Sequence, residues 1–147
     1  MFFEYKQERI LNWREFRLQL KNWPESIDTV AQIWSKAPIT NNYLVYDDPK
    51  HWPDAWQLIN DGIFCDISIA LGMFYTLYYS SYPHKDTMQI EHYDIPLKHQ
   101  TLNLVSLEQG KYMLNFQLGR PVNILEAGSL PQPKYVLNAL NLPIKNK

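Results

Sequence analysis

Residues 65–80 read CDISIALGMFYTLYYS, the longest apolar stretch of the chain. As a helix this stretch would be apolar on nearly every face, and such helices are covered by their neighbours on all sides. It begins at Cys65, shortly after Gly62, and Pro83 follows it as a residue that interrupts helices. We therefore expect a central buried helix that starts at the cysteine, with the rest of the fold packed around it.

Helices are predicted on the N-terminal side of this stretch. Residues 7–20 are rich in apolar side chains, and a second helix is indicated from Pro24 onward. There, one helical face collects the apolar residues at i, i+3, i+4 and i+7 spacing: Ile27, Val30, Ala31 and Trp34. Residues 53–60 predict a short helix, with Gly62 where a C-terminal cap would lie.

Strands are predicted on the C-terminal side. Residues 88–93, 101–107 and 111–116 are short runs typical of strands, and Glu108-Gln109-Gly110 joins the last two as a tight hairpin. Residues 122–125 predict a further strand, and residues 135–140 a turn of helix within a proline-containing tail. This order indicates an α+β fold with N-terminal helices and a small antiparallel sheet. We expect one domain over residues 1–147, with a core over 24–126 and a tail over 127–147.

Composition excludes several classes of function. The chain has 147 residues, with 14 Lys and Arg against 15 Asp and Glu, so its net charge of −1 argues against nucleic acid as a partner. No apolar run is long enough to cross a membrane, and no signal peptide is visible at the N-terminus. A single cysteine excludes zinc sites built on paired cysteines and favours a reducing cytoplasm. A phage origin, with a host cytoplasm as location, would suit a small aromatic-rich chain.

Cys65 is the candidate nucleophile, because the start of a helix favours the thiolate form. A cysteine nucleophile needs a histidine base and an oxygen that orients the histidine. His99 precedes the first hairpin strand and Asn115 ends the second. A turn at 108–110 would leave these two about 13 Å apart along the ladder. A turn nearer Leu107, or a bulge, would bring them together.

The order of these motifs resembles the transglutaminase-like cysteine enzymes of the papain-like superfamily. The resemblance covers residues 52–116 and is carried by residues 52–66, which lead to the cysteine, and by residues 98–115, which hold the histidine strand and its hairpin. It implies Cys65 as nucleophile, His99 as base and Asn115 as orienting residue. The family usually has one residue between the glycine and the cysteine, where Ile63 and Phe64 stand here. It also usually has Asp in the place of Asn115.

Other polar residues are candidates for supporting roles. Gln57 and Asn60, on the short helix before Cys65, could help the Cys65 backbone N–H to bind an oxyanion. An alternative is that His92, Asp94 and His99 form a metal cluster, although they lack a tight ligand motif. We expect no metal and no cofactor.

Two functions remain open on the sequence. The first is a hydrolase or acyltransferase that acts on amide or isopeptide bonds of a protein or peptide through a Cys-His-Asn triad. The second is an inactive member of the same fold that serves as a protein-binding or structural protein. The six Phe, five Trp and ten Tyr residues suit either the packing of a core or a partner interface.

Overall fold

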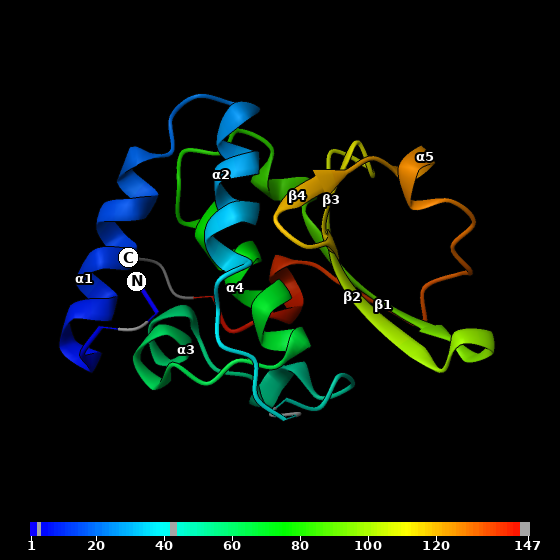
Figure 1. Ribbon diagram of the computed structural model, residues 1–147, viewed down its shortest axis with the longest axis horizontal. Coiled ribbons are helices and arrows are strands. Elements are labelled where there is room, and N and C mark those ends of the chain that lie inside the picture. The colour runs from blue at the N-terminus through cyan, green and yellow to red at the C-terminus, as the bar shows by residue number, and fades with distance from the viewer. Residues whose placement is uncertain (3, 42–43, 145–147) are drawn as a thin grey trace.

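The computed structural model describes residues 1–2, 4–41 and 44–144. The described residues form a layer of helices against one antiparallel sheet (Figure 1). The helices are α1 (Lys6–Gln19), α2 (Glu25–Trp34), α3 (Ala55–Asp61), α4 (Asp66–Tyr78) and the short α5 (Ile124–Ala127). The strands are β1 (Gln89–Ile95), β2 (Gln100–Leu107), β3 (Tyr112–Gln117), β4 (Arg120–Val122) and β5 (Tyr135–Leu137). The predicted α+β class, with N-terminal helices and a small antiparallel sheet, is confirmed.

Helix α4 is the centre of the fold, as its apolar sequence predicts. Residues 68–77 are all buried, and α1, α2 and α3 lie on the side of α4 away from the sheet or along its flank (Figure 1). The four residues of the predicted stripe on α2 are also buried: Ile27, Val30, Ala31 and Trp34. Gly72 on α4 lets the Trp34 ring approach so closely that an added Cβ would lie 2.1 Å from it.

One hydroxyl group joins three of the helices. The indole N–H groups of Trp13 on α1 and Trp34 on α2 each donate to Oγ1 of Thr76 on α4, over 3.0 Å. Thr76 in turn donates to the Gly72 carbonyl at 2.7 Å. All three side chains are buried, so this network satisfies polar groups that would otherwise be costly inside the core.

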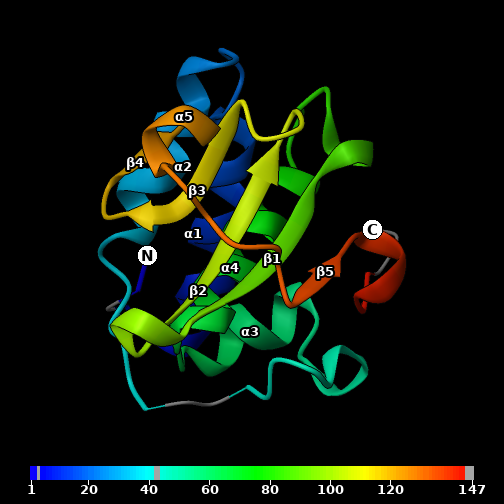
Figure 2. The ribbon, with the colours of Figure 1, turned by 90° about the vertical axis from the view of Figure 1, so that its right-hand side faces the viewer.

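The sheet has strand order β4-β3-β2-β1-β5, and every pair in it is antiparallel. Its inner face contributes Ile90, Val105, Leu107 and Leu114 to the main core with α4. Its outer face carries a second cluster made of Tyr93, Leu104, Met113 and Val122. Figure 2 shows the chain between α5 and β5 running across this outer face. Both faces of β2 are therefore covered, which is why its apolar residues do not alternate with polar ones.

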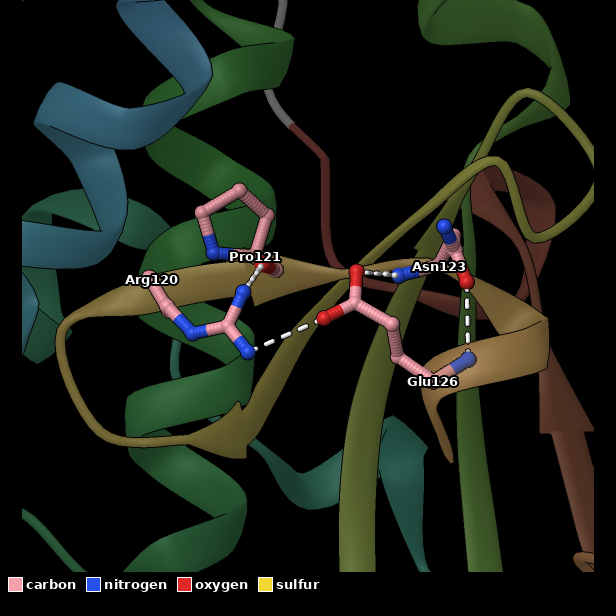
Figure 3. A network of polar contacts seen from close by, with 4 residues as sticks. All are labelled: Arg120, Pro121, Asn123 and Glu126. Atoms are coloured by element: carbon pink, nitrogen blue, oxygen red, sulfur yellow. Dashed lines mark hydrogen bonds and ion pairs between the residues drawn. The ribbon is translucent and has the colours of Figure 1, made fainter. Parts of the chain in front are cut away.

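The C-terminal part of the chain differs from the sequence prediction. Strand β4 ends at Val122, and residues 124–127 form helix α5 where a strand was predicted, because Asn123 caps the helix by accepting the Glu126 N–H at 2.7 Å. Arg120 pairs with Glu126 at 2.9 Å across this corner (Figure 3), and the pairing lowers the pKa of the Glu126 carboxyl.

Residues 135–137 form strand β5 on the free edge of β1, and the predicted turn of helix is confined to the 3-10 turn Ala139–Asn141. The tail also enters the main core through Leu137 and Leu142. The N-terminal segment enters it through Trp13 on α1 and through Leu20, which follows that helix. The core thus extends beyond residues 24–126. No helix among the described residues has the length and apolar character needed to span a bilayer.

Candidate active site

Cys65 lies at the start of α4, as the sequence predicts, where it is the N-cap residue. Its exposed fraction is 1%. The hydroxyl oxygen of Ser68, one turn into the helix, accepts the Cys65 N–H at 2.6 Å. The hydroxyl hydrogen of Ser68 lies within reach of two acceptors on Cys65, the carbonyl oxygen at 3.0 Å and Sγ at 3.6 Å. Ser68 therefore fixes the cysteine at the positive end of the helix dipole.

Asp66, the first residue of α4, ties the helix to two strands. Its Oδ2 accepts a hydrogen bond from Nδ2 of Asn103 on β2 at 2.8 Å. Its Oδ1 accepts one from Nδ2 of Asn115 on β3 at 3.0 Å. The Asn115 amide also donates to the Asn103 carbonyl at 2.9 Å. The start of the cysteine helix is thus held against the middle of the sheet.

A histidine–asparagine pair adjoins this contact. His92 on β1 lies directly opposite Asn103 on β2, and its Nδ1 is 2.6 Å from Oδ1 of Asn103. Both side chains are buried. An amide oxygen at Nδ1 holds the ring in one orientation and leaves Nε2 for proton transfer, which is the relation of base to orienting residue in thiol triads.

A cavity of about 390 Å³ opens beside the pair, and its lining includes Asp66, His92 and Asn103. Tyr46 stacks on the His92 ring, with centroids 4.3 Å apart and planes 8° from parallel. The Lys134 ammonium lies 5.0 Å from the centroid of the Tyr46 ring, and a hydrogen bond with Tyr46 raises the pKa of that ammonium group. The cavity therefore combines aromatic surface, carboxylates and one cation beside the imidazole.

His99 lies away from this network. It is an exposed residue with φ +48° that follows the 3-10 turn Pro96–Lys98 between β1 and β2, and its N–H donates to the Pro96 carbonyl. Since β2 is extended, His99 is about 13 Å along the strand from Asn103. The β2–β3 register pairs Leu107 with Tyr112 and Val105 with Leu114, so the hairpin forms at 108–111 and does not place His99 opposite Asn115. Asn115 itself is part of the Asp66 network.

Gln57 and Asn60, the predicted oxyanion donors, lie on α3 and accept hydrogen bonds through their oxygen atoms. Gln57 belongs to the capping box of α3, where its Oε1 accepts the Asp54 N–H at 3.1 Å. The Asn60 backbone carbonyl accepts a hydrogen bond from the guanidinium of Arg9. The Cys65 N–H, expected to be the main donor, is engaged by Ser68. Within the described ranges, no group of three or more His, Cys, Asp or Glu side chains could hold a metal ion, so His92, Asp94 and His99 form no cluster.

The position of His92 opposite Asn103 depends on the turn that joins β1 to β2. Pro96-Leu97-Lys98-His99 forms the connection between two strands rather than the entry of one. A hairpin centred on that connection pairs residues whose numbers sum to 195, as Ile95 with Gln100, and this register places His92 opposite Asn103. The strand pattern alone gave no reason to choose this turn.

Comparisons with known proteins identify the architecture. No family model matches the sequence, and no curated protein matches it either. Solved structures do match: calcium-bound LapG of Legionella pneumophila has a TM-score of 0.73 at 18% identity, over 92% of this chain and 77% of LapG. EGTA-treated LapG has a TM-score of 0.72 at 18% identity, over 91% of this chain and 74% of LapG. At this identity the likeness concerns the fold, and the chain therefore has the transglutaminase-like α+β architecture that its sequence predicted.

Proposed function

We propose that this protein is a transglutaminase-like cysteine hydrolase or acyltransferase that acts on amide or isopeptide bonds of a protein or peptide. Cys65 is the nucleophile, His92 the base and Asn103 the orienting residue. The observation that carries the proposal is the 2.6 Å contact between His92 Nδ1 and Asn103 Oδ1, on a strand pair that is hydrogen-bonded to the first residue of the Cys65 helix. His92 and Asn103 thus take the roles that the sequence suggested for His99 and Asn115.

The proposed chemistry is that of a cysteine nucleophile assisted by a histidine base. Nε2 of His92 accepts the thiol proton as the Cys65 sulfur forms a bond to the substrate carbonyl carbon. The carbon–nitrogen bond then breaks, the leaving amine takes the proton from His92, and a thioester remains. Water or a second amine attacks the thioester, giving its proton to His92, and the thiol leaves with that proton. The N-terminus of the thirteen-residue helix α4 favours the thiolate and the negative charge on the substrate oxygen.

One of the LapG structures is calcium-bound, and Asp66, a carboxylate in the lining of the cavity beside His92, is not placed to bind such a cation. Both Asp66 oxygens accept hydrogen bonds from amide N–H groups. The positive hydrogen atoms of these groups occupy the side of the carboxylate where a cation would bind, whereas calcium needs oxygen ligands around it. The proposed chemistry therefore includes no step through a metal.

Alkylation of Cys65 by iodoacetamide at about pH 6 tests the proposal, because a free thiol with a pKa near 8.5 is almost fully protonated there. We expect measurable alkylation of the folded protein, and a rate at least tenfold lower in His92→Ala, which removes the base. His84→Ala, an exposed histidine elsewhere, is the matched control and should leave the rate unchanged. A loss of rate in His99→Ala with none in His92→Ala would instead support the assignment suggested by the sequence.

The second candidate is a protein-binding or structural role without catalysis. The near-complete burial of Cys65 favours it, because a buried cysteine with a hydroxyl partner also serves as a packing residue. On this alternative the thiol reacts only when the protein unfolds. Alkylation would then follow the unfolding rate, and His92→Ala would change it no more than its effect on stability requires.

A further inference from the structure

The three amide and carboxylate side chains beside His92 form a chain of hydrogen bonds with a fixed direction. An ionised carboxylate has only acceptors, so Asp66 requires the Nδ2 end of both Asn103 and Asn115 to face it. With its Nδ2 committed to Asp66, Asn103 can offer only Oδ1 to His92. His92 must then carry its proton on Nδ1.

We propose that Asp66 is a positioning residue that selects the tautomer of His92. It acts through Asn103, by fixing which end of that amide faces the imidazole. This inference deepens the proposed function, because the Nδ1–H tautomer is the one that leaves Nε2 able to accept the Cys65 proton. It also explains why an amide serves beside His92: an aspartate at position 103 would place a second carboxylate 2.8 Å from Asp66.

The direction of these hydrogen bonds depends on the charge of the Asp66 side chain more than on its shape. In Asp66→Asn, the new side chain offers one oxygen and one NH₂ group to two NH₂ donors. Asn115 cannot turn over, because its Nδ2 also donates to the Asn103 carbonyl at 2.9 Å. Asn103 is the amide that turns over, because its Nδ2 was held only by the carboxylate that the substitution removes. Its NH₂ group then faces His92 Nδ1, which must become an acceptor, and the ring proton moves to Nε2.

Nitrogen-15 NMR of the imidazole tests this directly, because the protonated and unprotonated ring nitrogens have distinct shifts. In the wild-type protein at about pH 8.5, where imidazoles are neutral, we expect the protonated-type signal on Nδ1 of His92. In Asp66→Asn we expect it on Nε2. The matched control is Asp94→Asn, the same substitution two residues from His92 in the same cavity lining, which should leave the tautomer unchanged.

Exchanging the carboxylate and the amide between positions 66 and 103 should restore the Nδ1–H tautomer of His92. In the double variant Asp66→Asn with Asn103→Asp, the new amide at 66 donates to the carboxylate at 103 and still accepts from Asn115. The carboxylate presents an oxygen to His92, so we expect the signal to return to Nδ1. A merely structural role for Asp66 would not predict this recovery.

The outcomes separate this inference from the proposed function. An Nε2–H tautomer in the wild type, no switch in Asp66→Asn, or no recovery in the double variant would each overturn it. The wild-type measurement holds even if a variant does not fold. If the tautomer switches as expected but Cys65 of the folded protein is inert to iodoacetamide, the positioning by Asp66 stands and the catalytic role of Cys65 fails.

Discussion

Asn115 adopts a backbone conformation that residues with a side chain seldom take, with φ at +70°. It lies near the end of β3, where the pairing with β4 is irregular between Met113 and Gln117. The local turn of the chain directs its amide to Asp66 and to the Asn103 carbonyl. Left-handed conformations at non-glycine residues cluster at functional sites, where surrounding contacts hold them in place.

A pair of substitutions at this residue separates backbone strain from side-chain bonding. Asn115→Ala and Asn115→Gly lose the same amide hydrogen bonds, but only glycine accepts a positive φ without cost. We expect the glycine variant to be more stable than the alanine variant by about 1 kcal/mol, as measured by urea unfolding. In an ordinary strand the order is reversed, so an alanine variant of equal or higher stability would show that φ is not strained here.

At the scale of elements, the packing of α4 against α2 requires a glycine at position 72, which has no side chain. Alanine is the better helix former, by about 1 kcal/mol over glycine. At position 72, however, a Cβ would lie 2.1 Å from the Trp34 ring, which is itself buried. The contact between α2 and α4 therefore has no room for even one methyl group.

We accordingly expect Gly72→Ala to lower the free energy of unfolding by about 1–3 kcal/mol despite the gain in helix propensity. Trp34→Phe is the matched second variant, because the smaller ring makes room while remaining apolar. In a double-mutant cycle the pair should be less destabilised than the sum of the two single changes. Additive effects would mean that the α2–α4 contact adjusts without strain.

The sequence predicts the elements that depend on local patterns, but not the pairings that depend on residues far apart in the chain. The stripe on α2 and the apolar run of α4 are local patterns, and each predicted its helix and its buried face correctly. The pairing of His92 with Asn103 depends on which residues form a turn between two strands, and a shift of that turn moves every partner. The sequence correctly predicts Cys65 at a helix start. No local pattern indicates that its neighbour Asp66 binds two asparagines, because these partners come from β2 and β3.

At the scale of the whole molecule, the C-terminal tail completes both the sheet and the core. Strand β5 covers the edge of β1, and the buried Leu137 and Leu142 pack into the main core. Burial of each leucine contributes about 1.5–3 kcal/mol. Domains of this kind have total stabilities of about 5–15 kcal/mol, so the tail supplies a large part of the whole.

A chain that ends at residue 133 should therefore lose roughly 3–6 kcal/mol in urea unfolding. Its exposed β1 edge should also make it associate with itself, which size-exclusion chromatography would detect. Within the full chain, Leu142→Ala should lower the free energy of unfolding, because Leu142 is only 7% exposed. Leu140→Ala is the matched control and should not, because Leu140 is 93% exposed. If the shortened chain unfolds at the same urea concentration as the full one, the tail is an accessory and the core is complete without it.

The Thr76 hydroxyl that joins Trp13 and Trp34 also affects how fast the helices can part. Both indole protons are buried on one oxygen atom, so neither can exchange with solvent deuterium while α1 and α2 remain on α4. Their exchange requires an opening that separates these helices, and such an opening approaches the unfolding of the whole core. The two indole protons should thus be among the slowest in the molecule to exchange with deuterium, and their exchange rates should be nearly equal.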